Sequence, residues 1–172
     1  MISPILQIAP VAVVTIYLVR WRIGLSRRNS QSWDSLLARL APGWTASALG
    51  DHFLSKEGLN STPDETWEHI HGARGLRAMY RNAGVMLGMA DYAARNCETI
   101  DTELLAALRS DATQIRIGAL KALAHFAINR ASENVRLNSF QVASMYTGMA
   151  ARMAQLLQVS APDMLPDFVA AM

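Results

Sequence analysis

The chain contains one cysteine, Cys97, among its 172 residues. A single thiol excludes an intramolecular disulfide and any zinc site that is built from several cysteines. Nucleophilic cysteine chemistry also requires a paired base and an electropositive pocket. Cys97 lies at the end of a predicted helix, on its apolar side, and we therefore expect it to be a small core residue.

Charge is also scarce, because charged residues make up 17% of the chain and the formal net charge is +2 at pH 7. This balance is too small to indicate a nucleic-acid partner, and much of the positive excess lies beside the N-terminal apolar segment. The sequence has no alternating apolar run long enough for a strand and no internal repeat. These absences predict an all-α protein.

Catalytic motifs are absent as well, since no residue group has the spacing of a known catalytic, metal or nucleotide site. His125 shares a polar stripe with Lys121 and Asn129, at four-residue spacing on a helix. A catalytic histidine would need a nucleophile and an orienting acid, and the sequence identifies neither. We therefore expect no cofactor and favour a role that is not enzymatic.

The N-terminal segment is the most informative part of the chain. Charged side chains are absent from residues 2–19, and this pattern followed by arginines is typical of a membrane anchor with a cytoplasmic basic flank. As a helix it would extend ~27 Å, slightly less than a ~30 Å hydrocarbon core. Gln7 and Pro10 weaken it further. The arginines that follow are Arg20, Arg22, Arg27 and Arg28.

Residues 2–19 predict a single-pass protein with the N-terminus outside and the helical domain in the cytoplasm. A cleaved signal peptide fits poorly, because no basic residue precedes the apolar run and no A-x-A site follows it. The remaining alternative is a helix or arm that is buried in an assembly. The arginine cluster is also suited to rest on anionic headgroups, at about 1 kcal/mol per arginine.

Residues 30–172 are predicted to form one helical domain, after the anchor and its arginine cluster in residues 1–29. The clearest helix start is Thr62–Glu65, which places a hydroxyl at the N-cap, proline at N1 and glutamate at N3. Gly72 and Gly75 mark a bend or break in the helix that follows. Short loops favour an antiparallel bundle of about three long and two to three short helices. The predicted helices are 33–40, 45–56, 63–96, 102–129, 138–158 and a short piece that Ser160 opens.

Helical spacing of apolar residues predicts the core. Residues 115–128 are apolar on nearly every side, which predicts that their helix is central. Met145, Met149 and Met153 form a stripe that we interpret as core rather than as an adaptable binding groove. The predicted core residues are Leu76, Met79, Tyr80, Ala83, Met86, Leu87, Ala90, Ala94, Leu105, Leu108, Ala112, Ile115, Ala119, Ala122, Leu123, Phe126, Val142 and Leu156.

One cluster has metal-ligating side chains: Glu65, Glu68, His69 and His71. Glu68 and His71 have the Glu-x-x-His spacing of di-iron bundles, which would place both on one helical face. A complete site needs a second copy of this motif, and the sequence has none. The alternative interpretation is a solvated helix start with a local pair.

Two glycines on the polar side of the 63–96 helix, Gly84 and Gly88, form a second candidate site. Glycines four residues apart leave a flat strip on which another backbone can lie closely. Each also costs ~1 kcal/mol relative to alanine in an exposed helix, so the pair weakens the helix unless something packs there. The strip either receives a partner helix or a second copy, with Arg77, Arg81 and Asp91 at its rim, or is covered by the short N-terminal helices.

Two functional hypotheses follow from these features. The first is a membrane-tethered interaction or scaffold domain that associates with itself or with another protein through the glycine strip. The second is a membrane-tethered metal-binding bundle or enzyme that uses Glu65, Glu68, His69 and His71, with His125 as a further ligand. The arginines at 74, 77 and 81 suggest a third role, in binding a phosphate or an anionic lipid.

Overall fold

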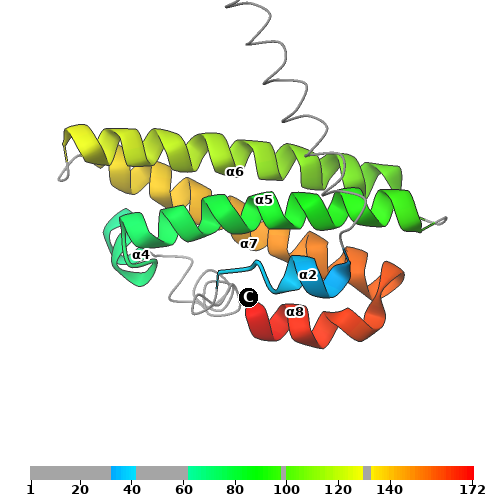
Figure 1. The fold of residues 1–172 in the computed structure, drawn as a ribbon. Helices are drawn as coiled ribbons and strands as arrows, with labels where there is room; N and C mark the ends of the chain where they lie inside the picture. The colour runs from blue at the N-terminus through cyan, green and yellow to red at the C-terminus, as the bar shows by residue number, and fades with distance from the viewer. Residues whose placement is uncertain (1–31, 42–61, 98–99, 130–132) are drawn as a thin grey trace, which may run out of the picture. The chain divides into compact units, whose positions relative to one another are not determined.

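The computed structural model describes residues 32–41, 62–97, 100–129 and 133–172. The chain divides into two units, residues 1–32 and 33–172, and the helices described below belong to the second. This part is helical without a strand, as predicted (Figure 1). Its helices are α2 (Trp33–Leu37), α4 (Pro63–His69), α5 (Ala73–Asn96), α6 (Thr102–Ile128), α7 (Glu133–Ser160), the 3-10 helix η2 (Pro162–Met164) and α8 (Leu165–Ala171).

The predicted bundle of three long helices with shorter ones is therefore confirmed for the described residues. The predicted N-terminal hydrophobic helix and the predicted helix 45–56 both lie outside them. Among the helices that are described, none combines the length and the apolar character that crossing a bilayer requires.

The start of α4 forms as predicted. The Thr62 side chain accepts a hydrogen bond from the Glu65 backbone N–H, and the Glu65 carboxylate accepts one from the Thr62 N–H. Helix α4 ends at His69, and a turn separates it from α5. In that turn His71 and Gly72 both have positive φ, at 58° and 60°. The predicted break is thus confirmed, and it lies at Ile70–Gly72.

The other helix boundaries agree in part. Asp101 caps α6 by accepting a hydrogen bond from the Glu103 N–H, as expected. The prediction that the next helix starts at Asn138 was wrong, because α7 already begins at Glu133. The side chain of Asn138 donates to the Asn134 carbonyl inside the helix, so its polar group is used without a helix start. Ser160 does the same with the Leu156 carbonyl at the end of α7.

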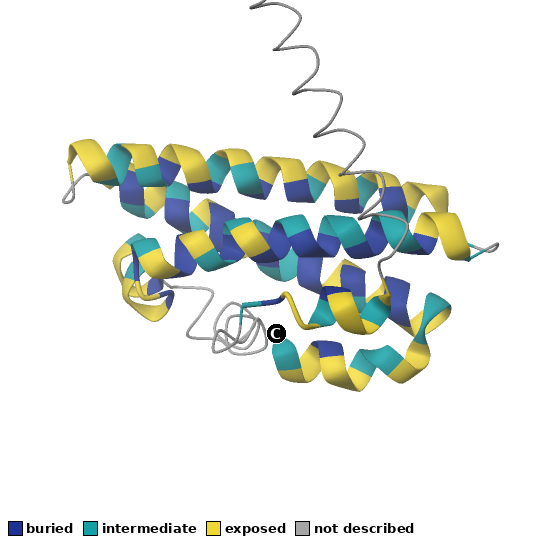
Figure 2. Cartoon of the chain, in the orientation of Figure 1, coloured by how far each residue is buried: buried dark blue, intermediate teal, exposed yellow. Residues whose placement is uncertain are grey.

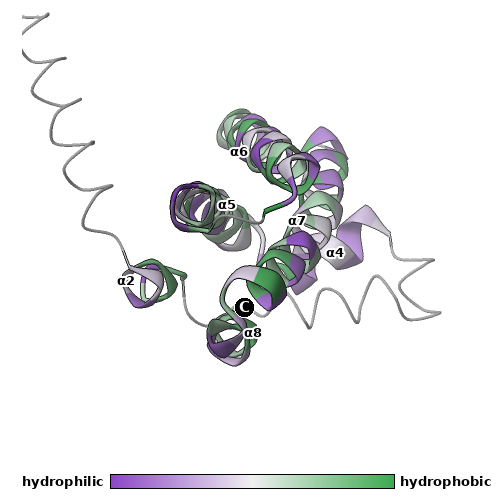
Figure 3. Cartoon of the chain, turned by 90° about the vertical axis from the view of Figure 1, so that its right-hand side faces the viewer, coloured by the Kyte–Doolittle hydropathy of each residue, from purple (hydrophilic) through white to green (hydrophobic). Residues whose placement is uncertain are grey.

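Helix α7 is the centre of the bundle. It contacts α4, α5, α6, α8 and η2, whereas α6 packs against α5 and α7 (Figure 3). The prediction that α6 is central was therefore wrong. Its outward side is solvent-exposed (Figure 2), and large apolar side chains lie there, with exposed fractions of 62% for Ile117 and 87% for Ile128. An apolar composition on all sides did not imply burial on all sides.

The predicted core is otherwise mostly confirmed. The apolar faces of the three long helices are buried, including Met149 and Met153 on α7, while Met145 is half-buried. Tyr80, Leu87, Leu123 and Phe126 are only half-buried, and Ala94 is exposed. On α5 the buried face extends further than predicted, because α2 packs along one side of the helix and Ile70 packs against its start. The additional buried residues on α5 are Gly75, Asn82, Val85, Met89 and Ala93.

Candidate functional site

A pocket lies on the surface of α5 beside Gly84. It has a volume of about 650 Å³ and lies where the chain leaves α2, between that segment and helices α5 and α6. A Cβ atom built on Gly84 meets no described atom within 4 Å, apart from its own helix and chain neighbours. The residues that line this arginine pocket are Ala38, Arg39, Leu40, Ala41, Tyr80, Arg81, Gly84, Val85 and Arg116.

The arginine pocket is positively charged. Arg39 comes from the segment after α2, Arg81 from α5 and Arg116 from α6, and none of the described residues that line the pocket is acidic. Within the described part of the chain, the ion pairs use other arginines, and all three lie between helices. They are Arg109–Asp91, Arg136–Asp64 and Arg152–Asp111. The positive charge of the pocket is therefore not compensated by any of the described residues that line it.

Arg116 is held in place by Tyr80. Its Nη2 donates to the Tyr80 hydroxyl over 3.0 Å, and its guanidinium carbon lies 4.8 Å from the centre of the Tyr80 ring. Its Nε is buried and has no hydrogen-bond partner among the described residues. A buried donor that is left unpaired costs roughly 1–3 kcal/mol, and more when the group is charged. A ligand that accepts a hydrogen bond from this nitrogen would remove that cost.

The wall formed by the segment after α2 is fixed by Asn82, which is fully buried on α5. Its Oδ1 accepts a hydrogen bond from the Ala41 backbone N–H over 2.8 Å. Its Nδ2 donates to the Tyr146 hydroxyl over 3.0 Å, and that hydroxyl also lies 3.6 Å from Sδ of Met172. The buried Asn82 amide thus joins the pocket wall to α5 and, through the Tyr146 hydroxyl, to α7 and Met172.

The two glycines of the predicted strip have different surroundings in the structure. At Gly88 a Cβ atom would lie 3.5 Å from Cδ2 of Leu36, so α2 covers this end, while Gly84 remains open. Trp33 of α2 also packs edge-on against Tyr92, with ring centroids 5.0 Å apart. The covering of Gly88 by a short N-terminal helix is the second of the two interpretations given above.

The residues predicted at the rim of the strip are also separated. Asp91 binds Arg109 of α6 at 3.0 Å, so its charge is used within the chain. Arg77 and Arg81 are exposed, and Arg81 lines the arginine pocket whereas Arg77 does not. The four arginines that follow the apolar N-terminal segment, Arg20, Arg22, Arg27 and Arg28, lie outside the described residues.

The four predicted metal ligands do not all lie on one helical face, because Glu65, Glu68 and His69 are on α4 and His71 is not. Glu65 is used in the capping box, and His71 lies beyond the end of α4, in the turn with positive φ. Glu68 and His71 are therefore not one turn apart on a continuous helix, which the Glu-x-x-His interpretation required. Throughout the part of the chain that the structure describes, no group of three or more His, Cys, Asp or Glu residues is placed to hold a metal ion.

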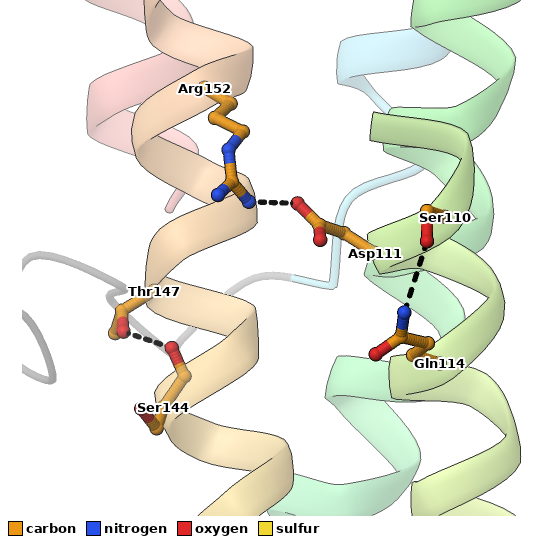
Figure 4. A network of polar contacts seen from close by, with 6 residues as sticks. All are labelled: Ser110, Asp111, Gln114, Ser144, Thr147 and Arg152. Atoms are coloured by element: carbon orange, nitrogen blue, oxygen red, sulfur yellow. Dashed lines mark hydrogen bonds and ion pairs between the residues drawn. The ribbon is translucent and has the colours of Figure 1, made fainter. Parts of the chain in front are cut away.

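His125 and Cys97 lie apart from this pocket. His125 is half-buried in the last turn of α6. Cys97 is half-buried at the end of α5, with its Sγ 3.9 Å from the Ser160 carbonyl oxygen. A group of polar contacts joins α6 and α7 away from the pocket (Figure 4). Arg152 of α7 forms an ion pair with Asp111 of α6, and the hydrogen bonds beside it, from Gln114 to Ser110 and from Thr147 to Ser144, each lie within one helix.

The comparison with known proteins does not add a relative. No model of a protein family, no curated protein and no solved structure matches the chain.

Sequence reasoning found Arg81 and Gly84 but missed their neighbours in the arginine pocket. Two of these neighbours, Arg39 and Arg116, are far from Arg81 in the sequence, and Tyr80 was assigned to the core face. The packing of α2 and α6 on α5 brings them together. The available signal was Arg116 itself, a charged residue inside the most apolar stretch of α6. A charge in such a stretch needs a partner or a ligand.

Proposed function

We propose that this chain is a helical binding module without catalytic activity, tethered to a membrane by residues 2–19, that engages an anionic partner at the arginine pocket. The observation that carries the proposal is the convergence of three arginines on one concave site without a lining acid among the described residues. Like charges gathered at one site repel each other, and a bound anion relieves that repulsion.

The charge of the pocket argues against a second copy of the chain as its occupant. In a two-fold symmetric interface the same patch contributes both sides, so Arg81 would face a region that contains Arg81 of the other copy. Like charges placed directly opposite each other cost free energy at an interface. The expected self-association through the glycine strip is therefore replaced in this proposal by binding of a partner with negative charge.

The absence of a catalytic arrangement supports a binding role. Among the described residues, the pocket lining contains no carboxylate, histidine, serine or cysteine to act as a base or nucleophile. Arginine is effectively always protonated and does not exchange protons near neutral pH. What remains is a cationic, partly apolar site of a size that is usual for small-molecule pockets.

The test is calorimetric titration of the full chain, in detergent, with a panel of small polyanions that contains citrate, pyrophosphate and tetra-aspartate. We expect at least one to bind, and to lose binding when Arg39, Arg81 and Arg116 are all changed to Gln. The matched control changes Arg74, Arg77 and Arg95 to Gln, which removes the same charge outside the pocket. Absence of binding, or equal loss in both triple variants, would contradict the proposal.

The tether is tested separately by membrane fractionation. The full chain is expected to stay in the membrane pellet through high-salt and alkaline carbonate washes, whereas a chain that starts at Ser30 is expected in the supernatant. Release of the full chain by salt alone would show peripheral binding through the arginines. If the full chain never enters the pellet, residues 2–19 are not an anchor.

A further inference from the structure

We propose that the anion bound in the arginine pocket is a phosphate monoester whose organic part lies against the apolar side of the same pocket. This inference rests on the proposed function and names the chemical class of the ligand. It is carried by three independent features of the site: the number and origin of its guanidinium groups, the unused donor on Arg116, and the division of its lining into a charged and an apolar part.

The number of arginines favours a ligand with more than one negative charge. One guanidinium is sufficient to form a planar, bidentate pair with a carboxylate. Here Arg39, Arg81 and Arg116 come from three different elements and line one cavity. A phosphate monoester has a charge of about −1.5 to −2 at pH 7 and three acceptor oxygens, so it can accept hydrogen bonds from several directions at once.

Arg116 of α6 and Tyr80 of α5 each have a hydrogen-bond donor without an acceptor among the described residues. Arg116 already donates through Nη2 to the Tyr80 hydroxyl, while its buried Nε has no partner among the described residues. The Tyr80 hydroxyl accepts that bond, and its own proton is not given to any described acceptor. The Tyr80 hydroxyl therefore offers a further donor to phosphate oxygens, beside a guanidinium that the tyrosine ring keeps oriented. The Arg116 Nε is shielded in the free protein and becomes a donor to the ligand only when the guanidinium turns toward it on binding.

The rest of the lining is apolar and fits an organic group. Leu40 and Val85 are buried core residues at the pocket wall, and Gly84 leaves the floor open, with Ala38 and Ala41 beside them. A volume of about 650 Å³ is far larger than inorganic phosphate requires and falls within the usual range for small-molecule sites. The same chemistry is present in soluble phosphate esters and in the headgroup of phosphatidic acid.

The experiment uses the full chain in nanodiscs of phosphatidylcholine and titrates phenyl phosphate by calorimetry, with phenyl sulfate and benzoate as singly charged comparators. We expect phenyl phosphate to bind at least tenfold more tightly than either comparator. Its affinity should rise as pH increases from 5 to 8, because the second ionisation of the ester has a pKa near 6. The affinity for phenyl sulfate should not change in this range.

The variants separate the pocket from general charge. Arg81→Gln and Arg116→Gln should each weaken phenyl phosphate binding about tenfold or more, since each removes a charge-assisted hydrogen bond. Arg116→Lys keeps the charge but loses Nε, and should fall between wild type and Arg116→Gln. Arg95 is an exposed residue in the last turn of α5, outside the pocket, and Arg95→Gln should leave binding unchanged. Arg81 is also exposed, so its variant remains informative if Arg116→Gln does not fold.

Phosphatidic acid included in the nanodisc identifies the source of the ester. If the headgroup is the ligand, phosphatidic acid suppresses the binding of added phenyl phosphate, and if the ligand is soluble, binding persists. Both outcomes support a phosphate monoester site. Failure of phenyl phosphate to bind, or binding that is insensitive to Arg81→Gln and Arg116→Gln, would overturn the inference. If citrate or tetra-aspartate still bound through the three arginines, the broader proposal of an anion-binding module would remain.

Discussion

Asn82 on α5 donates a hydrogen bond to the Tyr146 hydroxyl on α7 over 3.0 Å, and both side chains are fully buried. The same amide accepts the Ala41 N–H at the wall of the arginine pocket. Because buried polar groups are costly without partners, this pair makes the position of the pocket wall dependent on the packing of the bundle core. The proposed binding function and the stability of the fold are therefore linked through one residue.

Replacing Asn82 with Ala should destabilise the protein by about 2–4 kcal/mol, because it leaves a cavity, removes the acceptor of the Ala41 N–H and removes the amide donor to the Tyr146 hydroxyl. Tyr146→Phe keeps the ring and should cost less, about 1–2 kcal/mol. Chemical denaturation of both variants measures these differences. An Asn82→Ala variant as stable as wild type would show that the amide does not hold the wall.

Burial raises the pKa of the Tyr146 phenol above its ordinary value of 10.0, and the Asn82 hydrogen bond offsets this only in part. The folded state therefore retains the phenol proton more strongly than the unfolded chain does. The resulting contribution to stability is complete below pH ~10 and is lost at about 1.4 kcal/mol per pH unit above it. Tyr146→Phe should remove this part of the alkaline destabilisation. If the free energies of unfolding of wild type and Tyr146→Phe changed in parallel above pH ~10, this expectation would be contradicted.

The two glycines of the predicted strip should respond differently to substitution. Gly84→Ala should stabilise the protein by roughly 0.5–1 kcal/mol, because the site is open and alanine favours the helix. Gly88→Leu should destabilise it by about 1–3 kcal/mol, because the larger side chain displaces Leu36 and α2. Gly88→Ala is the matched control, since its Cβ makes an ordinary contact. Equal effects of Gly84→Leu and Gly88→Leu on stability would show that α2 does not cover Gly88.

The corner between α4 and α5 should not accept a side chain at Gly75. A Cβ atom there would lie 1.9 Å from the Ile70 carbonyl oxygen, which is backbone and cannot move aside. We expect Gly75→Ala to lower the free energy of unfolding by about 3 kcal/mol or more. Gly148→Ala on α7 is the control, since its nearest neighbour is the end of the Arg152 side chain at 4.0 Å, and it should be neutral or stabilising. A Gly75→Ala variant as stable as wild type would contradict the close approach of the Ile70 carbonyl oxygen to Gly75.

Local signals in the sequence were sufficient for much of the fold. The Thr62–Glu65 box and the Asp101 cap each depend on residues within one helical turn, and both formed as predicted. The start of α7 was missed although Ser132, a residue type that is suited to an N-cap, directly precedes the helix. Asn138 with Gln141 three residues later gave the fuller capping pattern, which favoured the later start. Local chemistry does not identify a helix start uniquely when two such patterns lie within a few residues of each other.

The candidate site could not be derived in the same way. Asn82 directly follows exposed Arg81 in the sequence, and it is buried because it lies between Tyr146 of α7 and the segment after α2. Arg39, Arg81 and Arg116 come together through contacts between elements that are distant in the chain. Helical periodicity reports the face of one helix, but it carries no information on which faces of different helices enclose a cavity.

The most direct test of the phosphate site is an NMR titration of the arginine Nε–Hε resonances of the full chain with phenyl phosphate. We expect the signals of Arg39, Arg81 and Arg116 to shift in a saturable way. The largest change should occur at Arg116, whose Nε is buried and has no partner among the described residues. The signals of Arg77 and Arg95 should not change. Uniform small shifts at all arginines, or no saturable shift at Arg116, would contradict a phosphate site in this pocket.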